Sequence, residues 1–145
     1  MQVRDIMNIN TIRILKGSSM ADAAKLAAMS NADCLFVVDE DDNFLGVLSE
    51  GDMMRAILPE MSEVMAGELS LSESYEITSE KGIELGHELI DDHLIPKPIM
   101  LKPEDPLVKA ATTMAIKKMR RLPVVKDGKL AGTVSRGDIC KAVLK

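Results

Sequence analysis

The sequence has no tryptophan, and its aromatic side chains are limited to two phenylalanines and one tyrosine. Proteins that bind single-stranded nucleic acid without sequence preference stack the bases on aromatic side chains in a basic groove. This chain carries a net charge of -5 and so offers neither feature. We therefore expect no nucleic-acid partner.

Cysteine is also scarce, and the two cysteines, Cys34 and Cys140, form no C-x-x-C motif. This spacing indicates reduced thiols and therefore predicts a reducing compartment, the cytoplasm. No apolar run is long enough to cross a bilayer, and the first residues carry no basic-then-apolar signal. We expect no membrane partner.

Charge is unevenly distributed along a chain that is 46% hydrophobic and long enough to bury a core. Residues 1–60 carry 5 basic and 10 acidic side chains, and residues 61–92 carry 1 and 9. Residues 93–145 carry 12 basic and 4 acidic side chains, a net charge of +8. A basic C-terminal third in an acidic protein suggests a partner of opposite sign.

The chain contains an internal repeat. The stretch GVLSEGDMMRAIL (46–58) returns as GTVSRGDICKAVL (132–144). Upstream, residues 11–24 align with 98–111, and CLFVVD (34–39) aligns with RLPVVK (121–126), at an offset of 87 that becomes 86 after the following turn. Such a repeat indicates two copies of one supersecondary unit that stack on each other.

Each copy reads as β-α-β-β-α. In the second copy we predict a short strand at 98–102, a helix capped by Asp105 with Pro106 in its first turn, and strands at 122–125 and 129–134. Asp127-Gly128 is a hairpin-turn signal, and a last helix starts near Gly137. In the first copy, Ser18 or Ser19 is the expected helix cap.

The segment between the copies, residues 61–92, is acidic and rich in serine, which indicates a linker. Residues 79–94 have helical periodicity, with Ser79 as a possible cap. Four polar side chains there fall at i, i+3, i+4 and i+7, a spacing that places them on one helix face and includes a Glu-x-x-His pair: Glu84, His87, Glu88 and Asp91. Because no second Glu-x-x-His exists, we interpret them as a solvated acidic face.

The motif S-x-G-D occurs once in each copy, between the last strand and the last helix. In one interpretation it is a capping box, in which Ser49 or Ser135 caps the helix and the acid three residues later bonds back. In the other, the carboxylates of Asp52 and Asp138 accept hydrogen bonds from a ribose diol, and the helix N-terminus and serine hydroxyl bind a phosphate. The sequence leaves both interpretations open.

With VRDIM (3–7), LFVV (35–38), LPVV (122–125) and the two S-x-G-D ends, the chain resembles a tandem pair of cystathionine β-synthase (CBS) domains, a Bateman module. The resemblance implies an α/β (α+β) fold of two β-α-β-β-α repeats packed with pseudo-two-fold symmetry. The predicted domains are repeat 1 at 1–60, the linker at 61–92 and repeat 2 at 93–145.

The resemblance also implies a regulatory module that binds adenosyl compounds, AMP, ADP or ATP before S-adenosylmethionine or NAD, in two composite clefts between the repeats. The Asp takes the ribose diol and the Ser lies beside the phosphate. Carried over by position, one cleft holds Ser135, Asp138, Thr133, Ile12 and Ala32, with Arg120 and Arg121 at the phosphate. The alternative for the two arginines, which the sequence leaves open, is a solvated face beside Lys117 and Lys118. The other cleft holds Ser49, Asp52, Val47, Ile99 and Met119.

We find no Ser/His/Asp or Cys/His arrangement and predict no enzymatic activity and no catalytic cofactor. The alternative to a nucleotide sensor is a ligand-free interaction module, which the two intact Ser and Asp pairs disfavour. Helix faces around Met53, Met54, Ile57 and Met114 should be apolar, so we expect a homodimer. The effector protein cannot be read from this chain.

Overall fold

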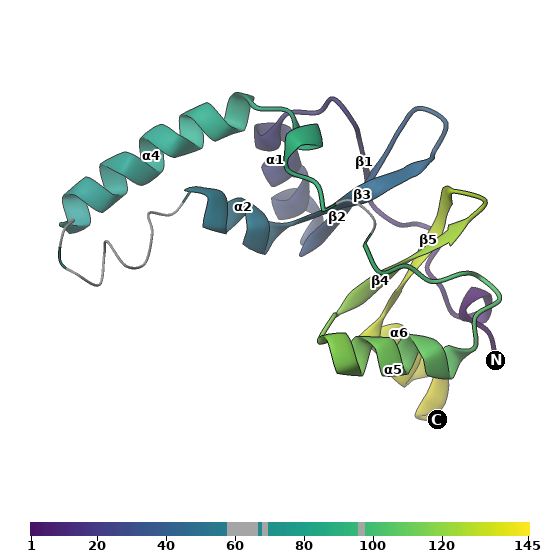
Figure 1. Cartoon of the computed structure of the whole chain (residues 1–145). Helices are drawn as coiled ribbons and strands as arrows, with labels where there is room; N and C mark the ends of the chain where they lie inside the picture. Colours follow the sequence, from purple (N-terminus) through teal and green to yellow (C-terminus); the bar gives the residue numbers. More distant parts are fainter. Residues whose placement is uncertain (58–66, 68–69, 96–97) are drawn as a thin grey trace. The chain divides into compact units, whose positions relative to one another are not determined.

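A computed structural model describes residues 1–57, 67, 70–95 and 98–145 of the chain (Figure 1). Helices and strands are mixed, which confirms the α+β class. The elements are η1 (Val3–Asp5), β1 (Arg13–Leu15), α1 (Met20–Ser30), β2 (Cys34–Val38), β3 (Phe44–Ser49), α2 (Glu50–Ile57), α4 (Leu71–His87), η2 (Ile90–Asp92), α5 (Leu107–Lys117), β4 (Arg121–Lys126), β5 (Lys129–Ser135) and α6 (Arg136–Val143).

The chain forms two compact units by internal contacts. The first unit comprises residues 1–15, 36–47 and 95–145, and the second comprises 16–35 and 48–94. The first unit therefore combines most of the second repeat with the first fifteen residues and with the β2–β3 turn. Contacts group the chain differently from sequence similarity, and the repeat boundaries stay a prediction.

The first unit is organised around the hairpin of β4 and β5, which pair antiparallel from Arg121↔Ser135 to Lys126↔Lys129. Asp127 and Gly128 join them with φ of 52° and 79°, the positive values that a tight hairpin turn requires, so the predicted turn is confirmed. The predicted strand at 98–102 is wrong, because only Leu101 bridges β4, in parallel with Val124.

The core of the first unit holds one residue from the opposite end of the chain. Val3, in η1, is fully buried, and backbone hydrogen bonds of 2.9 Å tie the segment down from Val3 N to Asp105 O and from Arg4 N to Pro103 O. Burying an aliphatic side chain stabilises the fold by about 1.5–3 kcal/mol. The cluster contains Val3, Leu101, Ala110, Met114, Leu122, Val124 and Val134.

The second unit is built from α1, α2 and α4, and α4 packs against both other helices. Ser70 starts α4 with a capping box, because its hydroxyl accepts from Glu73 N and the Glu73 carboxylate accepts from Ser70 N. The predicted cap at Ser79 is wrong, since a better cap lies nine residues upstream. The predicted helix at 79–94 also ends early, at His87. Residues 61–66 and 68–69 of the predicted linker lie outside the described residues.

Two further predictions concern helix starts. Ser19 caps α1 by accepting from Asp22 N at 3.1 Å, as predicted. Asp105 was expected to cap α5, but the N-cap position belongs to Pro106. The Asp105 carboxylate instead accepts from Lys102 N at 2.8 Å and pairs with the Lys109 ammonium at 3.2 Å, so it closes the turn that precedes the helix.

Candidate functional site

The second S-x-G-D motif lies where β5 ends and α6 begins, inside the first unit. Ser135 is the N-cap: its hydroxyl accepts from Asp138 N at 3.1 Å, and Oδ2 of Asp138 accepts from Ser135 N at 2.8 Å. The capping-box geometry is therefore present. Within the described part of the chain, Oδ1 of Asp138 has no hydrogen-bond partner, so one carboxylate oxygen stays available beside a helix N-terminus.

Three arginines gather at this junction. Arg121 faces Ser135 in the β4–β5 register. The first residue of α6 is tied to the start of β4, because Arg136 N donates to Arg120 O at 3.1 Å and Arg136 Nε donates to Met119 O at 2.8 Å. All three arginine side chains are exposed, which gives the junction a positive rim suited to an anion.

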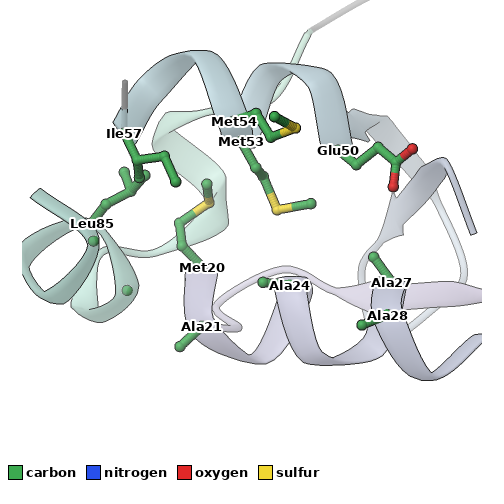
Figure 2. A pocket seen from close by; sticks show the side chains of 12 residues that line it. Met20, Ala21, Ala24, Ala27, Ala28, Glu50, Met53, Met54, Ile57 and Leu85 are labelled. Carbon is green, nitrogen blue, oxygen red and sulfur yellow. The ribbon is translucent and has the colours of Figure 1, made fainter. Parts of the chain in front are cut away.

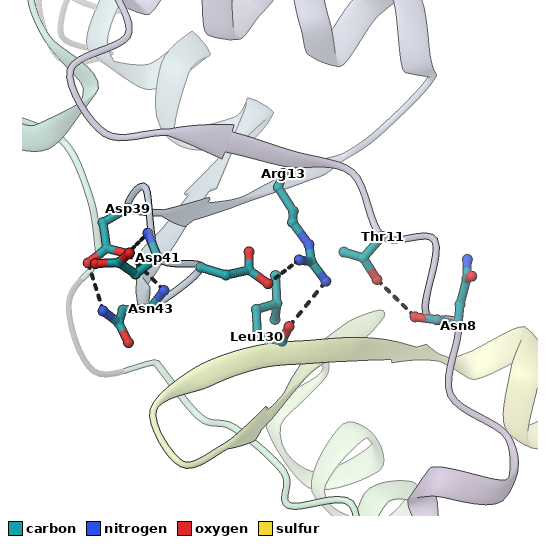
Figure 3. Close-up of polar contacts among 8 residues, drawn as sticks. Asn8, Thr11, Arg13, Asp39, Asp41, Asn43 and Leu130 are labelled. Atoms are coloured by element: carbon teal, nitrogen blue, oxygen red, sulfur yellow. Dashed lines mark hydrogen bonds and ion pairs between the residues drawn. The ribbon is translucent and has the colours of Figure 1, made fainter.

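Thr133 is 1% exposed and lies under the chain's N-terminal segment. Its backbone pairs with Asn8 in both directions, at 2.8 and 3.0 Å, and its hydroxyl lies 3.0 Å from that of Thr11. Figure 3 shows Asn8 and Thr11 on this segment. Ile12 follows and is 37% exposed. Sequence reasoning missed Asn8 and Thr11, because only the tertiary pairing brings them to Thr133.

Arg13 links the β2–β3 turn to strand β5 in the same unit (Figure 3). It forms an ion pair with Asp42, in the β2–β3 turn, and NH2 donates to Leu130 O at 3.1 Å. Phe44 N also donates to Gly128 O at 2.8 Å. These bonds hold β1, the strand that follows Ile12. The sequence did not indicate these contacts.

The first S-x-G-D motif lies in the second unit and has different partners. The Ser49 hydroxyl donates to Oδ2 of Asp52 at 2.8 Å, and Asp52 N donates to Ser49 Oγ at 3.1 Å. Oδ1 of Asp52 is 2.6 Å from NH2 of Arg55. The Ser49 hydroxyl, together with Arg55 and against partial burial, lowers the pKa of Asp52. Both carboxylate oxygens are thus engaged.

The structure places the other predicted residues individually. Val47 is half-buried and bridges Ile95, as Thr133 does with Asn8 in the other repeat. Ala32 is half-buried beyond α1, Met119 is half-buried before β4, and Ile99 is 37% exposed. Ala32, Ser49 and Asp52 belong to the second unit, and the remaining predicted residues belong to the first. Their roles in binding stay predictions.

The four polar residues of the linker do not share one helix face, because α4 ends before Glu88. Glu88 instead pairs with His93 at 2.5 Å, and Asp91 accepts from Gly17 N at 2.7 Å. No group of three potential metal ligands occurs in the described ranges.

The second unit also contains an apolar groove of about 370 Å³, and Figure 2 shows the methionines at its wall. Met53, Met54 and Ile57 line it, as the predicted apolar face required. Met114 does not belong to an exposed face, because it is 2% exposed in the core of the first unit.

The paired strand–turn–helix repeats, each ending in an S-x-G-D junction, define a tandem α+β module of the kind that the sequence resembled. A model of the CBS domain matches residues 3–59 and 90–145. The chain therefore belongs to the CBS-domain family and carries the domain in tandem.

Relatives in two organisms are similar over nearly the whole chain. The uncharacterized proteins MJ1225 and MJ1426 of Methanocaldococcus jannaschii are 26% and 28% identical, over 96% and 99% of this chain. The chloroplastic protein CBSX2 of Arabidopsis thaliana is 29% identical over 92% of this chain. The chain spans 41% of MJ1225, 92% of MJ1426 and 59% of CBSX2.

Solved structures of CBSX2 have the same fold. One is 27% identical with a TM-score of 0.77 and covers 99% of this chain and 94% of its own. Another, CBSX2 in complex with AMP, is 26% identical with a TM-score of 0.75, covering 99% and 96%. In the described ranges of our chain, no helix is both long and apolar enough to span a membrane.

Proposed function

We propose that this chain is a regulatory module that binds an adenine nucleotide, with AMP as the first candidate, at the Ser135–Asp138 junction. The observation that carries the proposal is the pairing of a carboxylate oxygen without a protein partner in the described residues, Oδ1 of Asp138, with the positive rim of Arg120, Arg121 and Arg136. A ribose diol needs an acceptor and a phosphate needs cations, and this junction offers both.

A relative supports the choice of ligand. CBSX2, at 26% identity over 99% of this chain, has been solved in complex with AMP. The S-x-G-D motif recurs in both repeats here, although one capping residue per helix would suffice for stability. In the proposed mode the Asp138 carboxylate accepts from the ribose hydroxyls, the arginines hold the phosphate, and apolar residues such as Ile12 contact the base.

The capping box and the ribose acceptor can coexist at Asp138, because they use different oxygens. Oδ2 holds the turn through Ser135 N, and Oδ1 remains for a ligand. The substitution Asp138→Asn separates the two roles. The amide oxygen of the new side chain keeps the bond to Ser135 N, while its amide nitrogen offers donors where the diol needs an acceptor.

The test is calorimetric titration of AMP into the full chain and into Asp138→Asn. We expect saturable binding to the unchanged chain and a loss of about 10- to 150-fold in the variant, the range for a hydrogen bond to a charged group. The melting temperature should change little. Asp138→Ala should lower both affinity and melting temperature, because it also removes the capping-box bond from Ser135 N to the carboxylate.

Two results would refute the proposal. If AMP, ADP and ATP all fail to bind the unchanged chain, the interaction-module alternative is favoured. If Asp138→Ala and Asp138→Asn affect stability alone and leave AMP affinity unchanged, the motif is only a cap. Titration with S-adenosylmethionine and NAD in parallel distinguishes a nucleotide sensor from a sensor of the other adenosyl ligands.

We further propose that the module senses its ligand without catalysis, acts on a separate effector protein and works in the cytoplasm. The support for the compartment is the sequence, which has two cysteines and no C-x-x-C motif. Homodimer formation also belongs to this proposal. Sedimentation equilibrium at micromolar concentration tests it, and a mass equal to one chain would count against a homodimer.

A further inference from the structure

The two S-x-G-D junctions are held by the same main-chain bond. In each repeat, the first residue of the last helix donates its N–H to the residue that precedes β2 or β4. In the first repeat, Glu50 N donates to Asp33 O at 3.1 Å. In the second repeat, Arg136 N donates to Arg120 O at 3.1 Å. The two backbones therefore match at the point where a ligand phosphate would lie.

The turn that leads into β2 or β4 is also the same in both repeats. Asn31 and Lys118 follow α1 and α5 with φ of 52° and 54°. The next N–H in each turn donates to the carbonyl five residues earlier, at 3.0 Å for Ala32 and 3.1 Å for Met119. A difference in ligand preference between the junctions must therefore come from their side chains.

The side chains at three matched positions differ in charge. The positions are the residue before β2 or β4, the first residue of that strand and the first residue of the last helix. In the second repeat they are Arg120, Arg121 and Arg136, and in the first repeat they are Asp33, Cys34 and Glu50. Three guanidinium groups are thus replaced by two carboxylates and a thiol.

The arginine of the second repeat also links the helix to the turn. Arg136 Nε donates to Met119 O at 2.8 Å, so this side chain reaches the turn that carries Arg120. Glu50 cannot make the corresponding bond to Ala32 O, because an ionised carboxylate has no hydrogen to donate. The first junction therefore lacks this link as well as the positive charge.

The carboxylates of the first junction are not neutralised alike. Asp52 pairs with Arg55 at 2.6 Å. Neither Asp33 nor Glu50 forms an ion pair within the described part of the chain. A phosphate at this junction would meet two anions without a paired cation, and like charges repel each other.

We propose that Asp33 and Glu50 are specificity-determining residues that exclude phosphate from the first junction. The inference rests on the proposed function, in which the matched arginines hold the phosphate of AMP at the second junction. One chain then binds one phosphorylated nucleotide, at Ser135–Asp138. A ligand of the first junction would be an adenosine derivative that has no phosphate.

The stoichiometry of AMP binding tests the inference on the unchanged chain. Equilibrium dialysis at AMP concentrations well above the dissociation constant should give one bound AMP per chain. Two bound AMP molecules of equal affinity would overturn this inference and leave the proposed function standing. No bound AMP would refute the proposed function itself.

The decisive variant places the cations of the second junction at the first. Asp33→Arg/Glu50→Arg is made in the Asp138→Asn background, in which the second junction binds weakly. The AMP affinity should rise about 10-fold or more above that of Asp138→Asn alone, as expected for charged hydrogen bonds. It should fall again as salt rises, because the new charges are screened. The adenosine affinity should change by less than about 3-fold, since adenosine has no phosphate.

Glu80→Arg/Glu84→Arg in the same background is the matched control. It changes the net charge of the chain by the same amount at two exposed residues of α4, and the AMP affinity should not rise. Glu50→Arg alone provides a second variant, because Glu50 is exposed whereas Asp33 is half-buried. It should raise the AMP affinity about 3-fold or more, and circular dichroism verifies that each variant folds.

Three results with these variants would overturn the inference. The first is no gain of AMP affinity in either Glu50→Arg or the double variant. The second is an equal gain in the α4 control, which would assign the effect to the net charge of the chain. The third is an equal gain for adenosine, which would show that the effect does not depend on the phosphate.

Discussion

The two S-x-G-D junctions have the same sequence pattern but different hydrogen-bond partners. At the first, Oδ1 of Asp52 is engaged by Arg55, whose guanidinium lies back over Gly51, 3.4 Å from the position of a Cβ there. At the second, Lys141 occupies the position of Arg55 and forms no ion pair with Asp138 in the described residues. A motif thus specifies where a carboxylate lies, and its neighbours decide whether the carboxylate is available.

The largest change in stability is expected at Gly132, in β5, the strand that precedes the second junction. The N-terminal segment packs against this strand at Asn8. A Cβ on Gly132 would lie 2.7 Å from the backbone oxygen of Asn8. Gly132→Ala should destabilise the protein by about 1–3 kcal/mol, the range for overpacking. Chemical denaturation measures this change.

Gly82→Ala is the matched control for Gly132→Ala, because a Cβ there meets nothing within 4 Å and alanine suits a helix interior. It should stabilise the protein by about 0.5–1 kcal/mol. Equal effects of the two substitutions would mean that the backbone of Asn8 does not restrict the side chain at position 132.

The second prediction exchanges the charge that distinguishes the two junctions. Arg136→Glu should weaken AMP binding about 10-fold, since a cation beside the phosphate becomes an anion. The binding of adenosine, which has no phosphate, should change much less. Titrations of both ligands at low and high salt measure the difference, and an equal loss for adenosine would place the effect on the fold rather than on the phosphate.

The third prediction concerns the ion pair at the first junction. Arg55→Ala should release Oδ1 of Asp52 and increase adenosine binding there by at most about 5-fold, because an exposed ion pair contributes no more than about 1 kcal/mol. Adenosine binding is measured in the Asp138→Asn background, so that the first junction alone contributes to it. Lys141→Ala is the control and should change nothing in this background.

The smallest effect is a pH dependence of stability. The Ser49 hydroxyl and Arg55 lower the pKa of Asp52 in the folded state. A lowered folded pKa contributes stability above the unfolded value of about 3.9, and that contribution is lost as the pH falls through the folded pKa. Thermal melts between about pH 6 and pH 2, with Asp52→Asn for comparison, should therefore converge at the acidic end. Parallel curves would show that Asp52 titrates alike in both states.

Much of the local structure could be predicted from the sequence. The hairpin at Asp127-Gly128, the Ser19 cap and the strands around Leu122 and Val134 follow from turn chemistry, capping and β-branched runs, which act within a few residues. The helix start at α4 was missed because Ser79 and Ser70 are both plausible caps, and packing on α1 and α2 favours the longer helix. The strand predicted at 98–102 is absent apart from the bridge at Leu101. Apolar residues alone favour a strand but do not supply the neighbouring strand with which it must pair.

The sequence by itself determined the repeat, the α+β class, the S-x-G-D junctions and the unequal charge of the chain's thirds, because each is a local pattern. Only the tertiary structure decided that Val3 is buried in the core beside the second repeat, that Asn8 and Thr11 cover Thr133, and that Arg55 engages Asp52 while Oδ1 of Asp138 has no protein partner among the described residues. These features depend on residues distant in sequence or on side-chain conformations that the same motif leaves open. They arise when the chain buries apolar surface and satisfies its backbone hydrogen bonds as a whole.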